Sequence, residues 1–461
     1  MTSRASALAV ARRLRAEGFR ALFAGGCVRD RLLGIPPRDF DVATSARPEQ
    51  VLALFPHTVP LGQRFGSVQV LEEPGAPVEV TTFRTEGGYS DGRRPDEVAL
   101  GTDPAEDARR RDFTVNALFE EPETGEVLDF VGGSADLDAR LLRAVGDPRA
   151  RFSEDRLRML RAVRFAARLG WRIEEQTLAA VRDLAPLAGS VSAERTREEL
   201  RRILVEGGAA RGLDLLRETG LLEVVLPEVA ACAGVPQPPE FHPEGDVLVH
   251  TRLVAAGLDL LPERPSTVLA FGALFHDIGK PRTISFADRI RFDEHDRVGA
   301  AMAEEACRRL RFSNDETDAV RDLVARHMTF RNLPEMREAK LRRFLADPLF
   351  PEHLALHRID CLASHGDLSM HRFAVTARER FAAEPPRPPR VITGDDLIAM
   401  GMRPGPRFAT ILRAVEDAWL ERSVKDAEEA REFVRRRFLG EGGVLPEDSP
   451  VPGDHPGEEG P

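Results

Sequence analysis

The sequence predicts an α+β protein, with a mixed N-terminal region followed by helices over the rest of the chain. Short β-type runs alternate with helical segments up to about residue 145, namely ALFAGG, DFDVAT, SVQVLE and VEVTTF. Helical periodicity takes over beyond residue 150, in RLRMLRAVRFAARLGW, TLAAVRDLA and REELRRIL. We therefore expect one α/β domain at the N-terminus and all-α domains after it.

Domain boundaries follow from length and from two proline-rich stretches. A chain of 461 residues allows about three domains. AGVPQPPEFHPEG and AAEPPRPPRV mark linkers near 233–245 and 382–391. The predicted parts are an α/β domain at 1–145, helical domains at 146–235 and 243–375, a helical segment at 390–438 and a disordered acidic tail at 440–461.

Composition excludes several classes of protein. The sequence contains no run of eighteen apolar residues, so we expect no membrane span, and MTSRASALAVARRLRAEGF lacks the pattern of a secretory signal. The four cysteines are widely spaced without a CxxC pair, which favours a reducing cytoplasm and argues against thiolate-bound zinc. The net charge is −11, yet Arg140 to Arg217 holds seventeen Arg against eleven acids, a local balance of +6.

Two carboxylates, Asp39 and Asp41 in PRDFDVAT, stand one residue apart in a β-type run. Residues i and i+2 share a face of a strand, so the two charges repel unless a cation lies between them. Mg²⁺ is commonly bound through a few carboxylates plus substrate phosphates, and two such ions can serve phosphoryl transfer. The alternative is a solvated strand end, where Asp is common.

The flanking motifs favour the metal interpretation. In FAGGCVRDRLLG a strand is expected to end at the glycines and a helix to begin, with Gly26 open to a phosphate and Arg29 on the first turn. A plain strand-to-helix turn is the alternative, and no P-loop or dinucleotide-binding motif is present. In EDRLRMLRAVRFAARLG, Asp155, Arg158, Arg161 and Arg164 recur at intervals of three and share one side of a predicted helix, facing outwards or into a cleft.

Together these motifs resemble the class II tRNA nucleotidyltransferase/poly(A) polymerase family, which includes bacterial CCA-adding enzymes. The matching stretches are GGCVRD, RDFDVAT, TTFRTEGGYSDGRRPDEV, RRDFTVNAL, FVGG…DL, EDRLRMLRAVRFAARLG and ERTREEL. The resemblance implies a polymerase-beta-like nucleotidyltransferase head at 1–145, then a helical neck and body that bind the nucleotide base and tRNA. It implies template-independent addition of CCA to the tRNA 3′ end, with CTP and ATP as donors and pyrophosphate released.

The resemblance also assigns roles to residues. Asp39 and Asp41 would be catalytic and hold Mg²⁺, with Glu79 as a third carboxylate. Gly26, Arg29 and Arg111 would contact the nucleotide phosphates, and Arg161 and Arg164 would make further nucleotide contacts. Asp155 and Arg158 would read the base: the carboxylate accepts from the amino group of cytosine or adenine and Arg donates to a ring acceptor, whereas guanine and uracil present a carbonyl there.

A second cluster, in VLVHT, LFHDIGKP and LHRIDCLASHGD, resembles the HD superfamily of metal phosphohydrolases. The resemblance implies a metal held by His250, His276, Asp277 and Asp360, and His295 and His327 could extend the set to a second ion. Imidazoles with carboxylates suit a transition metal better than Mg²⁺. Catalytic use of this metal and a scaffold role both stay open.

Several functions stay open within this frame. The full-length TEGGYSDGRRPDEVALG loop disfavours a CC-adding enzyme and leaves CCA addition or A addition, and the acidic tail disfavours a poly(A) polymerase. A different class is an HD phosphodiesterase with an inactive head. The oligomeric state is not predicted.

Overall fold

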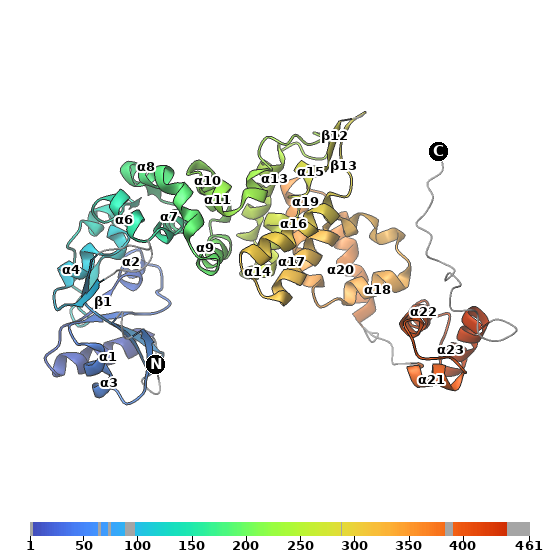
Figure 1. Cartoon of the computed structure of the whole chain (residues 1–461), viewed down its shortest axis with the longest axis horizontal. Coiled ribbons are helices and arrows are strands. Elements are labelled where there is room, and N and C mark those ends of the chain that lie inside the picture. Colours follow the sequence, from blue (N-terminus) through green and yellow to red (C-terminus); the bar gives the residue numbers. More distant parts are fainter. Residues whose placement is uncertain are drawn as a thin grey trace. The chain divides into compact units, whose positions relative to one another are not determined.

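The computed structural model describes residues 3–62, 66–71, 75–87, 97–286, 288–382 and 391–439. The chain divides into two compact units (Figure 1). The first contains Met1–Ala325 with Ala363–His365, and the second contains Arg326–Leu362 with Gly366–Pro461. The tail at 440–461 and the central part of the 85–101 loop, on which two of the functional predictions depend, lie outside the described residues.

The N-terminal part of the first unit is built on one mixed sheet, drawn in blue in Figure 1. Its strand order is β3-β4-β5-β2-β1-β8-β9. β1 pairs antiparallel with β2 and with β8, and β2 pairs parallel with β5. The strands are β1 Ala21–Ala24, β2 Val42–Thr44, β3 Thr58–Gly62, β4 Ser67–Val70, β5 Val78–Thr82, β8 Phe119–Glu120 and β9 Val127–Leu128, with β6 Arg84–Gly87 and β7 Glu97–Leu100 as a separate hairpin.

All four strands that the sequence predicts are confirmed as β1, β2, β4 and β5. The central strand β1 is buried along its whole length, as its continuous apolar run ALFA predicts. Helix α1 Ser3–Ala16 packs against β1, β2 and β5 through Ala7, Val10, Ala11 and Leu14. The other helices here are α2 Gly26–Leu32, α3 Pro48–Leu54, α4 Pro104–Arg109, the 3-10 helix Thr114–Asn116 and α5 Gly133–Asp138.

The rest of the first unit is helical, which confirms the α+β class. Helix α7 buries most of its length and contacts α9 and α10. The helices are α6 Pro148–Glu154, α7 Leu157–Leu169, α8 Glu175–Leu184, α9 Ala193–Val205, α10 Ala209–Glu218, α11 Leu221–Val225, α12 Pro227–Ala230, α13 Val247–Leu258, α14 Thr267–Phe275, α15 Lys280–Thr283, α16 His295–Arg309 and α17 Asn314–Arg326. Two short strand pairs, β10 Leu141–Leu142 with β11 Arg172–Ile173 and β12 Ile284–Phe286 with β13 Ile290–Phe292, join them.

The second unit is helical and contains two apolar clusters. One surrounds Phe330, Phe344 and Phe350, and the other gathers Leu397, Ile411 and Phe438. Its elements are the 3-10 helix His327–Glu335, α18 Glu338–Ala346, α19 Phe350–Ala363, α20 Ser369–Ala382, α21 Gly394–Ala399, α22 Arg407–Leu420, α23 Ala427–Val434 and the π-helix Arg435–Leu439. No helix among the described residues is long and apolar enough to cross a bilayer.

Candidate functional site

A cleft of about 600 Å³ in the first unit brings together the predicted residues of the head. The cleft is open to solvent, and its lining comes from the β1–α2 turn, the approach to β2, strand β5, the segment after α4, and helices α7 and α9. All ten residues that the sequence analysis assigned to the nucleotidyltransferase site, six in the head and four in the helical region after it, line the cleft: Gly26, Arg29, Asp39, Asp41, Glu79, Arg111, Asp155, Arg158, Arg161 and Arg164. Segments far apart in the sequence therefore form one site.

The two aspartates lie just before a strand, and the expectation that both belong to it is wrong. Strand β2 begins at Val42, so Asp39 and Asp41 belong to the preceding segment. One further ladder bond, from the Ala24 amide to the Asp41 carbonyl at 3.1 Å, holds Asp41 beside β1. Asp39 has no such bond and is exposed, whereas Asp41 is half-buried.

Negative charge is concentrated around Asp41. Burial raises the pKa of Asp41 to about 7, the charges of Glu79 and Asp39 add to this, and only Arg111 opposes it. Glu79 lies on β5, whose register pairs Val42 with Val80, so it stands beside Asp41 across a parallel pair. Among the residues that the structure describes, these three carboxylates do not bring their oxygens within 4.8 Å of one another. Their mutual repulsion is nevertheless the condition that a hard divalent cation relieves.

Two arginines in this cleft share one asparagine, and each is also paired with a carboxylate, Arg29 with Asp30 and Arg111 with Asp107. Arg29 Nη1 donates to Asn116 Oδ1 at 2.5 Å, and Arg111 Nη1 donates to the Asn116 carbonyl at 3.1 Å. Gly25, between β1 and α2, has φ +78, and a Cβ there would lie 2.9 Å from Arg111 Nη1. The turn therefore favours glycine at this position, because L side chains rarely adopt its positive φ, and a side chain would also displace the Arg111 guanidinium.

The predicted helix around Asp155 is interrupted at that residue. Helix α6 ends at Glu154 and α7 begins at Leu157, so Asp155 lies in the break and Arg158 on the first turn of α7. The Asp155 carboxylate accepts from Arg195 on α9 at 2.9 and 3.1 Å. Arg158 donates to Glu154 at 2.8 Å. Both side chains therefore face the cleft, each held by a different partner.

The remaining arginines of the row form ion pairs, that of Arg164 buried and that of Arg161 partly exposed. Arg161 donates to Asp112 at 2.6 and 2.8 Å, and Arg164, whose side chain is 1% exposed, donates to Glu199 at 2.6 Å. Burial alone would raise the pKa of Asp112, but Arg161, Asn116 and Arg158 outweigh it and lower the pKa to about 2. Burial lowers the pKa of Arg164 to about 10. These pairs connect α7 to the head and to α9, so they also have a structural role.

Sequence reasoning selected the motifs RRDFTVNAL and ERTREEL but not the residues in them that matter here. Asp112, Asn116, Arg195 and Glu199 are the partners of the predicted arginines and of Asp155. The available signal was that Asp112 and Asn116 lie in RRDFTVNAL and that Arg195 and Glu199 lie in ERTREEL.

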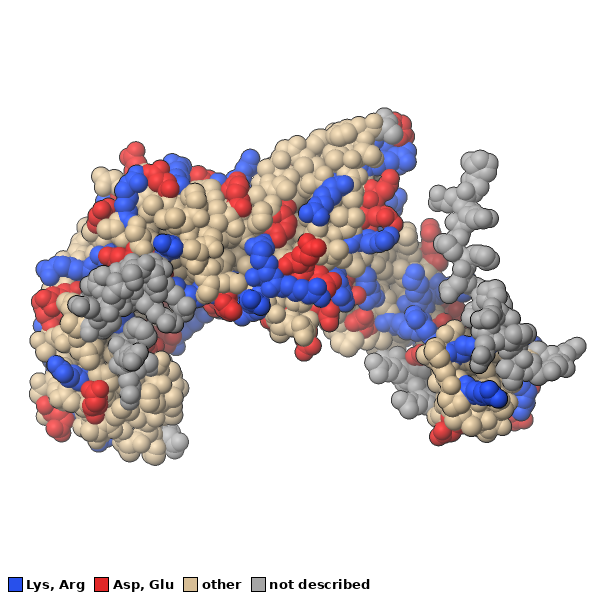
Figure 2. Space-filling view, viewed as in Figure 1, with Lys and Arg blue, Asp and Glu red and all other residues tan. Residues whose placement is uncertain are grey.

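Most of the arginine excess in the helical region is neutralised within the protein. Of the seventeen arginines from Arg140 to Arg217, eleven form ion pairs with carboxylates. On the face shown in Figure 2, basic and acidic side chains are interspersed. Four of these pairs, those of Arg143, Arg161, Arg168 and Arg182, use carboxylates outside residues 140–217, so the local balance of +6 overstates the charge that this region offers to a phosphate backbone.

A second group of candidate ligands lies in the helices from α13 to α16. His250 is on α13, His276 and Asp277 follow α14, and His295 begins α16. His250 Nε2 and His276 Nε2 are 3.2 Å apart, and Asp277 Oδ2 is 3.2 Å from His276 Nε2 and 3.7 Å from His250 Nε2. His295 Nε2 lies 3.6 Å from Asp277 Oδ1. The histidines and Lys280 hold the pKa of Asp277 well below its ordinary value, against the effect of burial.

The histidines of this group present the nitrogen that a metal requires. His276 Nδ1 lies 2.8 Å from the Ala273 carbonyl and His295 Nδ1 lies 2.7 Å from the Phe292 carbonyl. A carbonyl only accepts, so Nδ1 carries the proton and Nε2 keeps its lone pair. The donor set fits a transition metal, and the four buried cysteines are free. Asp360 and His327 belong to the second compact unit, and their place in the ligand set stays a prediction.

Comparison with known proteins finds three family models along the chain. The Poly A polymerase head domain matches residues 21–143, the "Probable RNA and SrmB- binding site of polymerase A" matches 170–232, and the HD domain matches 247–364. The CCA-adding enzyme of Geobacillus thermodenitrificans is 47% identical over 215 residues, 47% of this chain and 53% of that protein. That of Lactiplantibacillus plantarum is 49% identical over 208 residues, 45% of this chain and 51% of that protein. The chain spans about half the length of the curated relatives it matches.

Solved structures extend the similarity over nearly the whole chain. The CCA-adding enzyme of Bacillus stearothermophilus in complex with CTP has a TM-score of 0.68 at 28% identity, covering 95% of this chain and 99% of that one. The Thermotoga maritima CCA-adding enzyme complexed with tRNA has a TM-score of 0.57 at 18% identity, covering 94% of each chain, which supports the fold alone. Fold and cleft thus define a protein with a polymerase-type head followed by RNA-binding and HD domains. In sequence and fold the chain is similar to members of the class II tRNA nucleotidyltransferase/poly(A) polymerase family.

Proposed function

We propose that the chain adds CCA to the 3′ end of tRNA, using CTP and ATP without a nucleic-acid template. The observation that carries this proposal is the single cleft that contains the acidic pair, the phosphate-binding candidates and the Asp155–Arg158 pair. Similarity to this family and the CTP-bound structure of the Bacillus stearothermophilus relative support it.

The acidic side of the cleft would serve the chemical step. Asp39 and Asp41 would hold Mg²⁺, with Glu79 beside Asp41 as a third carboxylate. Bound there, Mg²⁺ would favour ionisation of the RNA 3′-hydroxyl and stabilise the charge on the departing pyrophosphate. The exposed Asp39 side chain can adjust to the ligand, whereas the ladder bond at Asp41 fixes its backbone.

The basic side of the cleft would orient the nucleotide. Arg29 and Arg111 keep their direction through Asn116 and through their ion pairs with Asp30 and Asp107 even without a ligand, so little conformational entropy is lost when a triphosphate binds. Gly26 would open the first turn of α2 to the phosphates, and the partly exposed Arg161 and the buried Arg164 would support the nucleotide from α7.

Base selection would depend on Asp155 and Arg158. A carboxylate has about four acceptor sites, so Asp155 can accept from an amino group of cytosine or adenine while keeping Arg195. Guanine and uracil would bring a carbonyl oxygen against this carboxylate. The Arg195 contact therefore orients the acceptor rather than blocking it.

The deciding experiment is incorporation of labelled CTP and ATP into three tRNA substrates, ending before CCA, at C and at CC. The proposal expects C, C and then A. Addition of a single A only to the CC-ended tRNA would indicate an A-adding enzyme, and long A tracts on unrelated RNA a poly(A) polymerase. No incorporation would refute the proposal and favour an HD phosphodiesterase with an inactive head. A cytoplasmic site of action is part of the same proposal.

A second candidate function is a metal-dependent phosphohydrolase in the region that matches the HD domain. The observation that favours it is the 3.2 Å separation of His250 Nε2 and His276 Nε2 beside Asp277, with each Nδ1 atom facing an oxygen acceptor, so that both Nε2 atoms are free to bind a cation. Hydrolysis of bis(p-nitrophenyl) phosphate by the metal-loaded protein would test it. Asp39→Ala should leave that hydrolysis unchanged, and His276→Ala should abolish it.

A further inference from the structure

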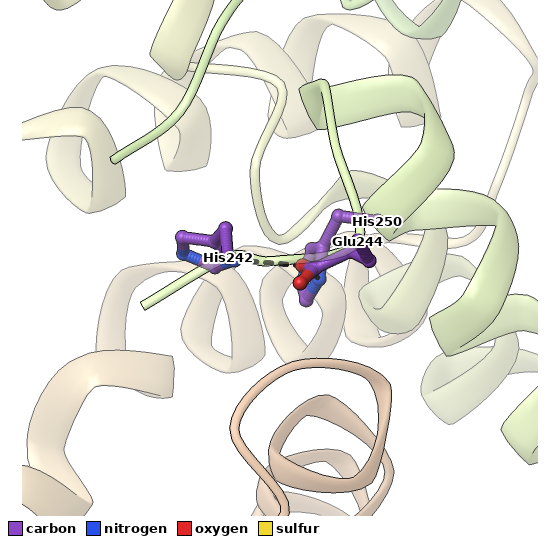
Figure 3. A group of neighbouring side chains, drawn as sticks. All are labelled: His242, Glu244 and His250. Carbon is purple, nitrogen blue, oxygen red and sulfur yellow. Dashed lines mark hydrogen bonds and ion pairs between the residues drawn. The ribbon is translucent and has the colours of Figure 1, made fainter. Parts of the chain in front are cut away.

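We propose that Glu244 is a positioning residue of the metal site around His250, and that it also brings His242 to this site. The inference rests on the proposed metal site. Glu244 lies in the segment before α13 and points between the two imidazoles (Figure 3). Its Oε1 is 2.7 Å from His250 Nδ1 and 2.8 Å from His242 Nδ1.

The carboxylate determines which nitrogen of each ring carries the proton. An ionised carboxylate only accepts hydrogen bonds, so both Nδ1 atoms must donate and both Nε2 atoms keep their lone pairs. The His250 side chain is 0% exposed and that of Glu244 is 8% exposed, so water does not compete at this contact. With the proton on Nε2 instead, His250 would direct an N–H at His276 Nε2 and Asp277 and could not bind a cation.

His250 differs in this respect from the other candidate ligands. His276 and His295 obtain the same tautomer from backbone carbonyls, which no substitution removes. His250 obtains it from a side chain, so its orientation can be changed by a single substitution. Carboxylate partners of this kind typically change metal affinity by about 10- to 100-fold when removed.

The segment that carries Glu244 is held by hydrogen bonds on both sides of the metal site. Asp246 caps α13 at the Val249 amide at 2.8 Å and also accepts from the Gly234 amide at 2.7 Å. Gln237 accepts from Lys280 Nζ at 2.7 Å, and Lys280 lies 2.7 Å from Asp277. The segment is therefore tied to the helix of His250 and to the turn of Asp277.

The second oxygen of Glu244 is itself unusual. Glu244 Oε2 is buried without a hydrogen-bond partner. Such a group is costly, and packing alone does not require it, because an apolar side chain would fill the space at lower cost. The presence of a carboxylate here therefore fits a function at Oε1.

The test measures Co²⁺ binding to the metal-depleted full chain by visible absorption. All variants carry Asp39→Ala, so that ions bound in the head do not contribute. We expect Glu244→Ala to weaken binding about 10- to 100-fold and Glu244→Gln, which keeps one acceptor oxygen, to weaken it less. Glu240→Gln, at an exposed position of the same segment, is the matched control and should bind like the parent. Proton–nitrogen correlation spectra should show Nδ1–H at His250 in the parent and loss of that preference in Glu244→Ala.

The metal site and the role of Glu244 in it can be refuted separately. If the parent does not bind Co²⁺, or if His276→Ala binds as the parent does, the metal site is wrong and the role of Glu244 is overturned with it. If His276→Ala abolishes binding while Glu244→Ala leaves affinity and tautomer unchanged, only the role of Glu244 is overturned. Should Glu244→Ala fail to fold, Glu244→Gln decides by the same two measurements.

Discussion

Replacing Asp155 by alanine removes the carboxylate that we assign to base selection, while the fold should remain. Among the described residues Asp155 forms an ion pair with Arg195, whose side chain is 28% exposed against 17% for Asp155, and its Oδ1 also accepts from the Leu157 amide at 3.2 Å. The partly exposed ion pair contributes at most about 1 kcal/mol to stability, and the bond to the first turn of α7 contributes about another 1 kcal/mol. The Asp155 main chain sits in the break between α6 and α7, where alanine is sterically acceptable.

The effect on selectivity should be larger than the effect on stability. A hydrogen bond to a charged acceptor contributes about 1.5–3 kcal/mol, which corresponds to about a 10- to 150-fold change in kcat/KM. The loss should fall on CTP and ATP, whose amino groups donate to Asp155. UTP and GTP should gain, because the repulsion between their carbonyl and the carboxylate disappears.

The assay is kcat/KM for all four nucleotides on tRNA ending before CCA and at CC, with thermal unfolding measured in parallel. Glu198→Ala is the matched control, because it removes an exposed ion pair with Arg201 on α9, away from the cleft. If kcat/KM falls for CTP and ATP but does not rise for UTP or GTP, the proposed repulsion between the carbonyl oxygen and the Asp155 carboxylate is wrong. Unchanged discrimination in a folded Asp155→Ala protein would refute the assignment of Asp155.

Three further predictions concern metal, charge and packing. Asp39→Ala should abolish CTP incorporation yet change the free energy of unfolding by less than about 0.5 kcal/mol, since Asp39 is exposed. Full incorporation of CTP by this variant would show that Asp39 takes no part in nucleotidyl transfer. The pKa of Asp112 falls from 3.8 to about 2 on folding, so the Asp112 carboxylate stabilises the fold above pH 3.8 and this contribution is lost as the pH falls through 2. Asp112→Asn should therefore lower the free energy of unfolding by about 2 kcal/mol at pH 7, and in denaturant titrations the difference should shrink below pH 4. Gly279→Ala should destabilise by at least about 1–3 kcal/mol and weaken Co²⁺ binding, because the new Cβ would lie 2.1 Å from the His295 carbonyl. Gly405→Ala, where no atom lies within 4 Å, is its control in thermal unfolding, and equal effects would contradict the packing argument.

Local patterns determined much of this protein. Strands β1, β2, β4 and β5 and helices α7, α8 and α9 lie where apolar periodicity predicts them, because neighbours at i+2 or at i+3 and i+4 set which face of an element is buried. Ten of the residues that line the cleft could also be selected from the sequence, since each occurs in a short motif, whereas Asp112, Asn116 and Arg195 were missed. Two-residue strands such as β8 and β9 could not, because so few residues carry no periodicity.

What those residues contact was decided by the tertiary structure. Asp155 meets Arg195 forty positions away, and Arg161 meets Asp112 forty-nine positions away. The sequence alone shows a net positive charge between Arg140 and Arg217, whereas the fold pairs most of those arginines with carboxylates. The physical reason is that an ion pair depends on the distance between two side chains in space, and packing between distant segments sets that distance.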